Sequence, residues 1–537
     1  MKALTAAEMR EVDRLTTERL GISQLQLMEN AGKQAADAIR QRYGLLRMSH
    51  VAVLCGKGNN GGDGFVVARF LKELRGVNAC VFLFARRDEL RGDAAANFAR
   101  WTEASGEIIE IIDEAALEKA WPRIAKAHVV VDALLGTSLR GPASGVIASV
   151  IERLNRHSKN ATLPRPSLIL AVDTSSGLPS DGQPSEGPVL RAHVTVTFTA
   201  PKVGQLISAD APCCGELLIR AIGSPDSLAE EVGQGAIRWA GPDEFGSLAF
   251  VRPADSHKGT FGHALILAGS VGKTGAAILA GYAGLRAGAG LVTVATPEPA
   301  QPIVAAAHPE YMTEPLKATK SGELAVRSLV DGTFGELEEG KSVLAIGPGL
   351  GTHRQTQEFI RTIVAQTELP VVLDADGLNA FAGDATSLRK RRTKFLGITP
   401  HPGEMARLLG ASTSSVQQDR VKTALESAKR WNAYVLLKGF HTVLASPAGQ
   451  VFVNTTGNAG LAKGGSGDVL TGVLAALTSQ FGTEDWLRIL AFGVYLHGAA
   501  ASGPGRSSDL SGMLAHEIAK AIPYARNALL RELQRRG

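Results

Sequence analysis

Polar residues that could transfer a proton follow several apolar runs in the first half of the chain. The segment GKGNNGGDG (56–64) carries two asparagines and Asp63 among its glycines, while Asp132, Asp173 and Lys202 each come at or just after a later apolar run. An acid, a lysine and amide-lined glycine loops suit proton transfer on a bound small molecule. Asp63 could instead only cap the helix that follows, and a lone aspartate such as Asp132 is often a turn-former.

The same glycine-rich segment contains the spacing G-x-G-x-x-G from Gly56 onward, which is typical of dinucleotide-binding loops. A carboxylate at Asp63 would repel a pyrophosphate there, and the next strand ends in residues 85–87 (ARR) without the acid that binds a ribose. The hypothesis that this protein is an oxidoreductase therefore rests on the G-x-G-x-x-G match alone. Asn59 and Asn60 instead offer several donors and oxygens to a ligand or a hard cation.

In the second half, glycines crowd the stretch TTGNAGLAKGGSGDVLTG (455–472). GGSGD at the start of an apolar helix forms a nest of backbone amides, which is a good anion-binding site. Asp468 stands at that helix start, where it could be an ordinary N-cap or could deprotonate a hydroxyl that attacks phosphorus. GSVGKTGA (269–276) does not have the spacing of a phosphate-binding P-loop, because with Lys273 fixed the first glycine would fall at Leu267.

Strands and helices alternate along both halves of the chain. In the first half we predict strands over 50–56, 78–84, 128–136, 167–177 and 193–201, and helices over 6–43, 63–74, 93–104 and 144–155. This alternation is typical of a parallel, doubly wound sheet, in which ligands bind beyond the carboxyl ends of the strands. A second alternating series begins at 263–270. The region 223–250 has no strong periodicity, so we predict two α/β domains that meet near residue 230.

Composition excludes several classes of protein. The chain has 537 residues, 45% of them hydrophobic and 20% charged, which is ordinary for a globular protein. The formal net charge of +5 is spread without a long basic run, so we expect neither nucleic acid nor a membrane as partner. Four cysteines make no disulfide framework, and the first residues do not read as a signal peptide, so we expect a cytoplasmic protein.

Four segments of the first half together resemble the epimerase domain of the bifunctional NAD(P)H-hydrate repair enzymes: NNGGDG (59–64), the stretch around Asp132, DTSSGL (173–178) and TFTAPKVG (197–204). In that family the domain interconverts the two epimers of hydrated NADH or NADPH. The resemblance implies an N-terminal Rossmann-like doubly wound α/β domain over 1–225. It implies substrate contacts from Asn59, Asn60, Gly61, Gly62, Asp63, Gly136, Thr137, Ser138, Leu139, Arg140, Gly141, Pro142 and Asp173.

The same resemblance implies a potassium ion held by Asn60, Asp132 and Ser176. It also makes Asp173 a residue that could move the proton in the epimerisation. We add Lys202 as a catalytic residue from its position alone.

The second half is similar to ribokinase-like kinases, and within them to the ADP-dependent NAD(P)H-hydrate dehydratases. The matching pieces include HKGTFGHALILAGS (257–270), IGPGLG (346–351), LDADGLNA (373–380), TPHPGE (399–404), LKGFHT (437–442) and NTTGNAGLAKGGSGD (454–468). The resemblance implies a C-terminal ribokinase-like α/β domain over 230–537. It implies ADP contacts from Lys438, Gly439, Phe440, His441, Thr442 and Gly467, and hydrate contacts from Ala276, Gly349, His401 and Asp468.

Three residues of the second half have alternative roles. A histidine such as His401 is more often structural than a ligand, but between two prolines that fix its loop we favour contact with the substrate. Asp374 and Asp376 could bind magnesium or merely shape the loop that follows their strand.

The resemblance implies a repair reaction in two parts. Asp468 takes the proton of the hydrate hydroxyl as that hydroxyl attacks the terminal phosphorus of ADP, with magnesium and helix amides stabilising the charge. Phosphate then leaves, which restores NADH or NADPH and gives AMP and phosphate. This dehydration uses the S hydrate, and the epimerase supplies it from the R hydrate. The alternative is a ribokinase-like kinase of a small hydroxylated metabolite fused to a nucleotide-binding domain. We also expect a homo-oligomer.

Overall fold

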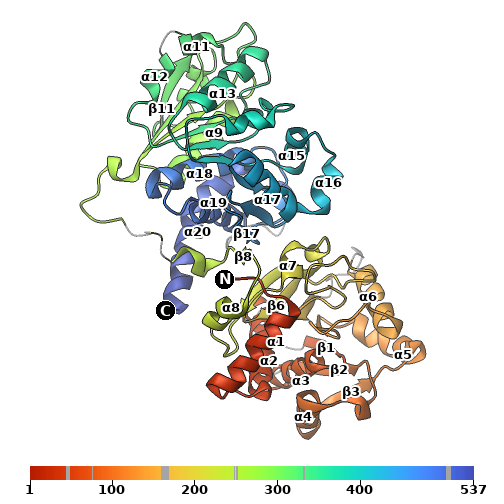
Figure 1. Cartoon of the computed structure of the whole chain (residues 1–537). Helices are drawn as coiled ribbons and strands as arrows, with labels where there is room; N and C mark the ends of the chain where they lie inside the picture. The colour runs from red at the N-terminus through yellow and green to blue at the C-terminus, as the bar shows by residue number, and fades with distance from the viewer. Residues whose placement is uncertain are drawn as a thin grey trace. The chain divides into compact units, whose positions relative to one another are not determined.

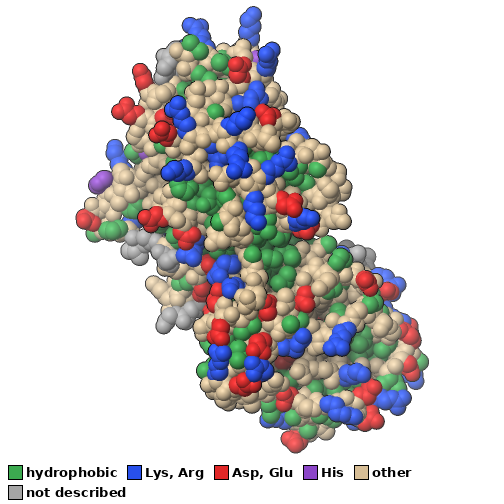
Figure 2. All heavy atoms as spheres, in the orientation of Figure 1, with side chains coloured by type: hydrophobic (Ala, Val, Ile, Leu, Met, Phe, Trp, Pro, Cys, Tyr) green, Lys and Arg blue, Asp and Glu red, His purple; other side chains and the backbone are tan. Residues whose placement is uncertain are grey.

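The computed structural model of the chain describes residues 1–43, 49–74, 76–158, 168–246, 248, 252–330, 333–502 and 510–536. The chain forms two compact units, Met1–Ile237 and Arg238–Gly537, coloured red to yellow-green and yellow-green to blue in Figure 1. On the face drawn in Figure 2, basic and acidic side chains are interspersed. No helix among the described residues has both the length and the apolar character needed to cross a membrane.

The first unit is built on a seven-stranded sheet in the order β3-β2-β1-β4-β5-β6-β7, with all neighbours parallel. Its strands are β1 (Ser49–Cys55), β2 (Val77–Leu83), β3 (Glu107–Glu110), β4 (Val129–Ala133), β5 (Leu168–Val172), β6 (Val194–Phe198) and β7 (Glu216–Arg220). The strand order reverses between β1 and β4, so this is a doubly wound sheet whose switch point lies between those two strands.

Helices cover both faces of this sheet. They are α1 (Ala6–Leu20), α2 (Gln24–Tyr43), α3 (Asn59–Lys72), α4 (Gly92–Glu103), α5 (Glu114–Ala125), α6 (Gly145–His157), α7 (Val203–Ile207) and α8 (Asp226–Val232). Alternate residues of β1 enter two separate cores, because side chains alternate across a strand. Val51 and Val53 pack with α2, α3 and α4 on one face, while Ala52 and Leu54 pack with α5 and α6 on the other.

The structure corrects the predicted boundaries at two helices. The single helix predicted over 6–43 is two helices, because Gly21 ends α1 in the left-handed conformation with a φ of 70°. The helix predicted from residue 63 begins at Asn59, four residues earlier, so the asparagines lie in the first turn of α3 and not on a loop. β3, α5 and β7 were not predicted.

The second unit contains a ten-stranded sheet in the order β11-β10-β9-β12-β13-β14-β15-β16-β17-β8. Its strands are β8 (Ile237–Trp239), β9 (His263–Leu267), β10 (Leu291–Pro297), β11 (Met312–Leu316), β12 (Val343–Ile346), β13 (Val371–Leu373), β14 (Leu396–Ile398), β15 (Tyr434–Leu437), β16 (Thr442–Ala445) and β17 (Val451–Asn454). Pairing is parallel from β11 to β15 and antiparallel from β15 to β17.

The helices of this unit are α9 (Thr274–Arg286), α10 (Gln301–Ala305), α11 (Arg327–Val330), α12 (Thr333–Glu338), α13 (Arg354–Gln366), α14 (Asp376–Asn379), α15 (Pro402–Leu409), α16 (Thr413–Gln418), α17 (Arg420–Trp431), α18 (Ser466–Phe481), α19 (Trp486–Ala501) and α20 (Ala515–Arg536). α18 is buried along most of its length. A Cβ on Gly472 would lie 2.0 Å from the carbonyl oxygen of Ala280, so a glycine lets α18 lie directly against α9. This packing fixes the N-terminus of α18, where Asp468 stands.

Candidate functional site

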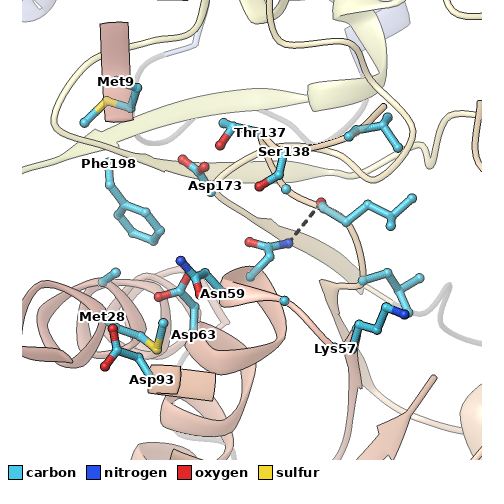
Figure 3. Close-up of a pocket in the computed structure, with 18 of the residues that line it drawn as sticks. Met9, Met28, Lys57, Asn59, Asp63, Asp93, Thr137, Ser138, Asp173 and Phe198 are labelled. Carbon is cyan, nitrogen blue, oxygen red and sulfur yellow. Dashed lines mark hydrogen bonds between the residues drawn. The ribbon is translucent and has the colours of Figure 1, made fainter. Parts of the chain in front are cut away.

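A cavity of about 790 Å³ opens at the carboxyl ends of the first sheet. Its lining comes from the segments that follow β1, β4, β5 and β6, together with α1 and α2. Figure 3 shows Asp173 and Asp63 pointing into this space, with Phe198 and Met28 beside them. The switch point of a doubly wound sheet is where such a site is expected.

The structure brings most of the predicted substrate contacts to this cavity. Asn59, Asn60, Asp63, the turn 136–140 and Asp173 all line it. Gly61, Gly62, Gly141 and Pro142 are not among its lining residues. A Cβ on Gly61 would lie 1.9 Å from the carbonyl oxygen of Gly56, and one on Gly62 would lie 2.6 Å from the Met28 sulfur. These two glycines therefore let the first turn of α3 pack closely against its neighbours.

The three residues assigned to a potassium ion lie together beside the turn after β4. Asp132 is fully buried, and its carboxylate accepts from the Ser176 hydroxyl (2.5 Å) and the Ser176 amide (2.9 Å). Asn60 donates from Nδ2 to the Leu135 carbonyl at 3.0 Å, and its buried Oδ1 has no hydrogen-bond partner among the described residues. Burial raises the pKa of Asp132 to about 6, although hydrogen bonds from Ser176 oppose the shift.

Asp173 and Lys202 form an ion pair in the wall of the cavity. The Lys202 ammonium is 1% exposed, and it donates to Asp173 Oδ1, to the Thr197 hydroxyl (2.8 Å) and to the Phe198 carbonyl (3.3 Å). Asp173 has a φ of 63°, in the left-handed region that aspartate tolerates better than most residues, and Gln205 donates to its carbonyl at 2.6 Å. The loop conformation therefore aims the Asp173 carboxylate at the lysine.

Asp13 of α1 is a site residue that the sequence reasoning missed. It lines the same cavity, and its Oδ1 is buried and has no hydrogen-bond partner in the part of the chain that the structure describes. Burial raises the pKa of Asp13 to about 6, and the Asp173 charge adds to the shift while Lys202 opposes it. Asp13 falls four residues after buried Met9 and three before buried Thr16, so an acid on the buried stripe of an amphipathic helix was the available signal.

In the second unit, Asp468 lies in the first turn of α18, as predicted. Gly465 caps this helix in the left-handed conformation, and no side chain supplies the cap hydrogen bond. Burial raises the pKa of Asp468 to about 6, the charges of Asp374 and Asp376 add to the shift, and Lys438 opposes it. Asp468 therefore can hold or release a proton near neutral pH.

Asp374 and Lys438 form a buried ion pair next to this helix N-terminus. Lys438 Nζ lies 2.7 Å from Asp374 Oδ1, and the Thr471 hydroxyl donates to Asp374 Oδ2 at 2.8 Å. Burial raises the pKa of Asp374, but Lys438 outweighs it and the pKa is lowered overall. A Cβ on Gly467 would lie 3.6 Å from both Asp374 Oδ2 and Lys438 Nζ. Sequence reasoning missed Thr471, which lies inside an apolar helix.

The predicted ADP loop, residues 438–442, joins β15 to β16. Gly439 has a φ of 147°, and Arg420 of α17 holds the loop by donating to the carbonyls of Leu437 (2.9 Å) and Phe440. The Phe440 ring is 49% exposed and stacks on His441 with ring centroids 4.0 Å apart. The loop therefore presents an aromatic face to solvent and a lysine to the interior.

The residues predicted to contact the hydrate differ in how far other residues of the chain already engage them. A Cβ on Gly349 would lie 2.9 Å from the Ala276 Cβ, so these two residues are neighbours. His401 is the N-cap of α15: its Nδ1 accepts from the amides of Gly403 (3.0 Å) and Glu404 (3.4 Å), while the side chain is 51% exposed. His401 thus has a structural role, and its outer edge stays open to a ligand.

Asp376 sits close to this region and is held by the chain on both oxygens. It accepts from the Gly351 amide at 2.8 Å and from Asn379 Nδ2 at 3.2 Å, and Lys273 Nζ lies 3.5 Å away. In the part of the chain that the structure describes, no three His, Cys, Asp or Glu side chains gather as a metal cage.

Comparison with known proteins matches each unit to a protein family. Residues 264–524 match the family described as NAD(P)H-hydrate dehydratase, and residues 24–204 match the family described as YjeF-related protein N-terminus. The chain is 40% identical to the bifunctional NAD(P)H-hydrate repair enzyme of Moorella thermoacetica, over 99% of this chain and 98% of that one. It is 34% identical to the enzyme of the same description from Escherichia coli, over 96% and 92% of the two chains.

A solved structure, the ADP/ATP-dependent NAD(P)H-hydrate dehydratase of Bacillus subtilis co-crystallised with ATP and Mg²⁺, is 33% identical to this chain. It matches 54% of this chain and 98% of its own, with a TM-score of 0.47.

Proposed function

Because this chain belongs to the family of bifunctional NAD(P)H-hydrate repair enzymes, with an epimerase and a dehydratase domain, we propose that the two clusters described above divide the repair between them. The cavity of the first unit epimerises the hydrate, within a domain that we assign to residues 1–225. The N-terminus of α18 dehydrates it, within a domain that we assign to residues 230–537. The product of the first site is then the substrate of the second.

In the epimerase cavity, Asp173 is the group that exchanges a proton with the hydrate, and Lys202 keeps its carboxylate in place. Asn60, Asp132 and Ser176 hold a potassium ion. The unpartnered buried Oδ1 of Asn60 supports this assignment, since amide, carboxylate and hydroxyl oxygens suit a hard cation. When bound, such an ion would supply positive charge beside the turn that contacts the substrate.

In the dehydratase site, Asp468 is the general base. The observation that carries this proposal is the position of Asp468 in the first turn of α18, with its pKa raised to about 6 by burial and by neighbouring carboxylates. Its carboxylate takes the hydroxyl proton of the hydrate as the hydroxyl oxygen attacks the terminal phosphorus of ADP. Backbone amides of residues 465–467 stabilise the charge that develops. Loss of phosphate then restores the reduced nicotinamide.

The loop 438–442 binds ADP, with Gly467 beside it. Magnesium bound with the nucleotide would neutralise charge on the transferred phosphoryl group. Protein-bound Mg²⁺ usually takes only one or two carboxylates plus phosphate oxygens, so one carboxylate of Asp374 or Asp376 would suffice. The four cysteines are buried and free, which supports a reducing, cytoplasmic location. A homo-oligomer stays a prediction.

One assay tests both activities. Each hydrate epimer is supplied separately with ADP and Mg²⁺, and recovery of reduced-cofactor absorbance is followed. We expect the S hydrate to be consumed directly and the R hydrate to be consumed through epimerisation. Failure to consume either epimer would overturn the proposal. Accumulation of a stable phosphorylated product would instead identify the alternative, a ribokinase-like kinase of a small hydroxylated metabolite.

A further inference from the structure

Three carboxyl groups and one ammonium meet in the cavity of the first unit. Asp13 comes from α1 and Asp63 from α3, and Asp173 follows β5. The Lys202 ammonium pairs with Asp173, and its charge acts to lower the pKa of Asp13 and Asp63. The lysine charge only partly offsets the effect of burial on Asp13 and Asp63, and the pKa of both acids is therefore raised.

Asp13 differs from the other two acids in what surrounds it. Its Oδ1 is buried and accepts no hydrogen bond from any described residue. A buried carboxyl oxygen without a donor is costly, whereas a substrate hydroxyl, or the N–H of the ring-opened form, would donate to it. The charged groups that line the cavity with it are Arg10, Lys57, Asp63, Glu89, Asp93, Arg140, Asp173 and Lys202. Of these, Lys202 lowers the pKa of Asp13 and Asp173 raises it.

Asp63 is less suited to proton exchange. Burial raises its pKa well above the ordinary value, and the charges of Asp173 and Asp13 add to that shift, so the protonated form of Asp63 is favoured. The pKa of Asp13, raised to about 6, lets that residue alternate between its two forms. Figure 3 shows the apolar side chains of Met9, Met28 and Phe198 around the cavity.

We propose that Asp13 is the second proton-transfer residue of the epimerase site and works with Asp173 on the hydrate. This inference rests on the epimerase function of the first unit. Asp173 takes the proton of the hydroxyl on the carbon next to the ring nitrogen, and that oxygen forms a carbonyl. The carbon–nitrogen bond breaks, its electron pair goes to the nitrogen, and Asp13 gives the nitrogen a proton.

The open form carries an aldehyde and an N–H group. Rotation about the carbon–carbon bond next to the aldehyde presents the opposite face of the carbonyl to the nitrogen. The nitrogen then attacks that face, its proton returns to Asp13, and the new hydroxyl takes its proton from Asp173. Atoms, electrons and both carboxyl groups end as they began, and the carbon has the opposite configuration.

The experiment measures conversion of the R to the S hydrate by chiral chromatography without ADP, in the full-length enzyme. Asp13→Asn keeps the shape of the side chain and cannot donate a proton. Asp13→Ala opens space for a small acid, so formate is added to it. Glu18→Gln is the matched control, because Glu18 lies on the same helix and is exposed, outside the cavity. Dehydration of the S hydrate with ADP reports folding of the rest of the chain.

We expect Asp13→Asn to lower kcat for epimerisation about 100-fold or more, the range in which general acid catalysis acts, with KM changed less than about threefold. Formate should restore activity to Asp13→Ala, and the decline of the wild-type rate above about pH 6 should vanish in Asp13→Asn. The inference is overturned if Asp13→Asn keeps epimerase activity within about threefold of wild type, if only KM changes, or if formate restores nothing.

The same experiment separates two kinds of failure. If the wild-type enzyme does not interconvert the epimers, the proposed function of the first unit is wrong. If the wild type interconverts them and Asp13→Asn does so equally well, only the role of Asp13 is wrong. Should Asp13→Asn fail to fold, formate rescue of Asp13→Ala decides the question.

Discussion

Lys438 and Asp374 are joined side chain to side chain, with Nζ 2.7 Å from Oδ1, directly beside the helix N-terminus that carries Asp468. The two charges of the pair have opposite effects on the pKa of Asp468. The Asp374 charge raises the pKa of Asp468, and the Lys438 charge limits the rise. Asp374 is 1% exposed and depends on Lys438 and Thr471 for its partners, so the pair also supports the fold around the site.

Removing the lysine should therefore destabilise the second unit. We expect Lys438→Met to cost about 3–5 kcal/mol in the free energy of unfolding, because it leaves a buried carboxylate without a counter-charge. Urea denaturation of the variant and of the wild type measures the difference. The double variant Lys438→Met/Asp374→Asn should recover part of the loss, since it removes the stranded charge. A loss below about 1 kcal/mol in the single variant would contradict this interpretation of the pair.

Replacing the proposed base should abolish one activity and keep the other. We expect Asp468→Asn to lower the dehydration rate of the S hydrate by about 10²- to 10⁴-fold, the usual contribution of a general base. Epimerisation in the first unit should stay at the wild-type rate. Absorbance of the reduced cofactor with ADP and Mg²⁺ follows the first reaction, and chiral chromatography follows the second. Equal dehydration by Asp468→Asn and wild type would rule out Asp468 as the base.

Dehydration should depend on pH through the same residue. A base must be ionised to accept a proton, so kcat/KM should fall as the pH drops through about 6, where burial and Asp374 place the pKa of Asp468. Asp374→Asn removes one of the charges that raise this pKa, and its midpoint should therefore shift to lower pH. A midpoint near 4 in the wild-type enzyme would show that the pKa of Asp468 is not raised.

Potassium should affect the epimerisation rate and the thermal stability of the first unit only. Exchanging K⁺ for tetramethylammonium at constant ionic strength should reduce epimerisation, because that ion is too large for the oxygens of Asn60, Asp132 and Ser176. Asn60→Leu should lose the response to K⁺, since it removes the unpartnered Oδ1. The readouts are the epimerisation rate and the thermal unfolding midpoint of the first unit. An unchanged rate and midpoint in both cations would argue against a potassium site.

The two units should also work when separated. Each has its own sheet and its own buried core, so we expect fragments 1–237 and 238–537 to fold independently. The first fragment should epimerise the hydrate and the second should dehydrate the S form only. Circular dichroism and the two assays check this. If either fragment is unfolded while the full chain is active, the units depend on each other for stability.

Local pattern in the sequence accounts for much of the fold. Apolar runs of strand length between helical segments predicted the parallel sheets, and a glycine nest before an apolar helix placed Asp468 in its first turn. These features depend on neighbours in the chain, which is why a single sequence carries them. The same local reasoning misplaced the start of α3. Glycines disfavour helices, but close packing of Gly61 and Gly62 against Gly56 and Met28 outweighs that preference.

Tertiary structure decided which side chains meet. Asp13 reads as one polar residue on an amphipathic helix, and only the packing of α1 against α8 and the segment after β6 brings it to the cavity of Asp173 and Lys202. Thr471 reads as part of an apolar helix, and only the placement of α18 next to β13 turns its hydroxyl to Asp374. The sequence by itself determined the two domains, their family and the residue types of each site. The raised pKa values of Asp13 and Asp468 come from burial and from charges distant in the chain, which only the folded structure brings together.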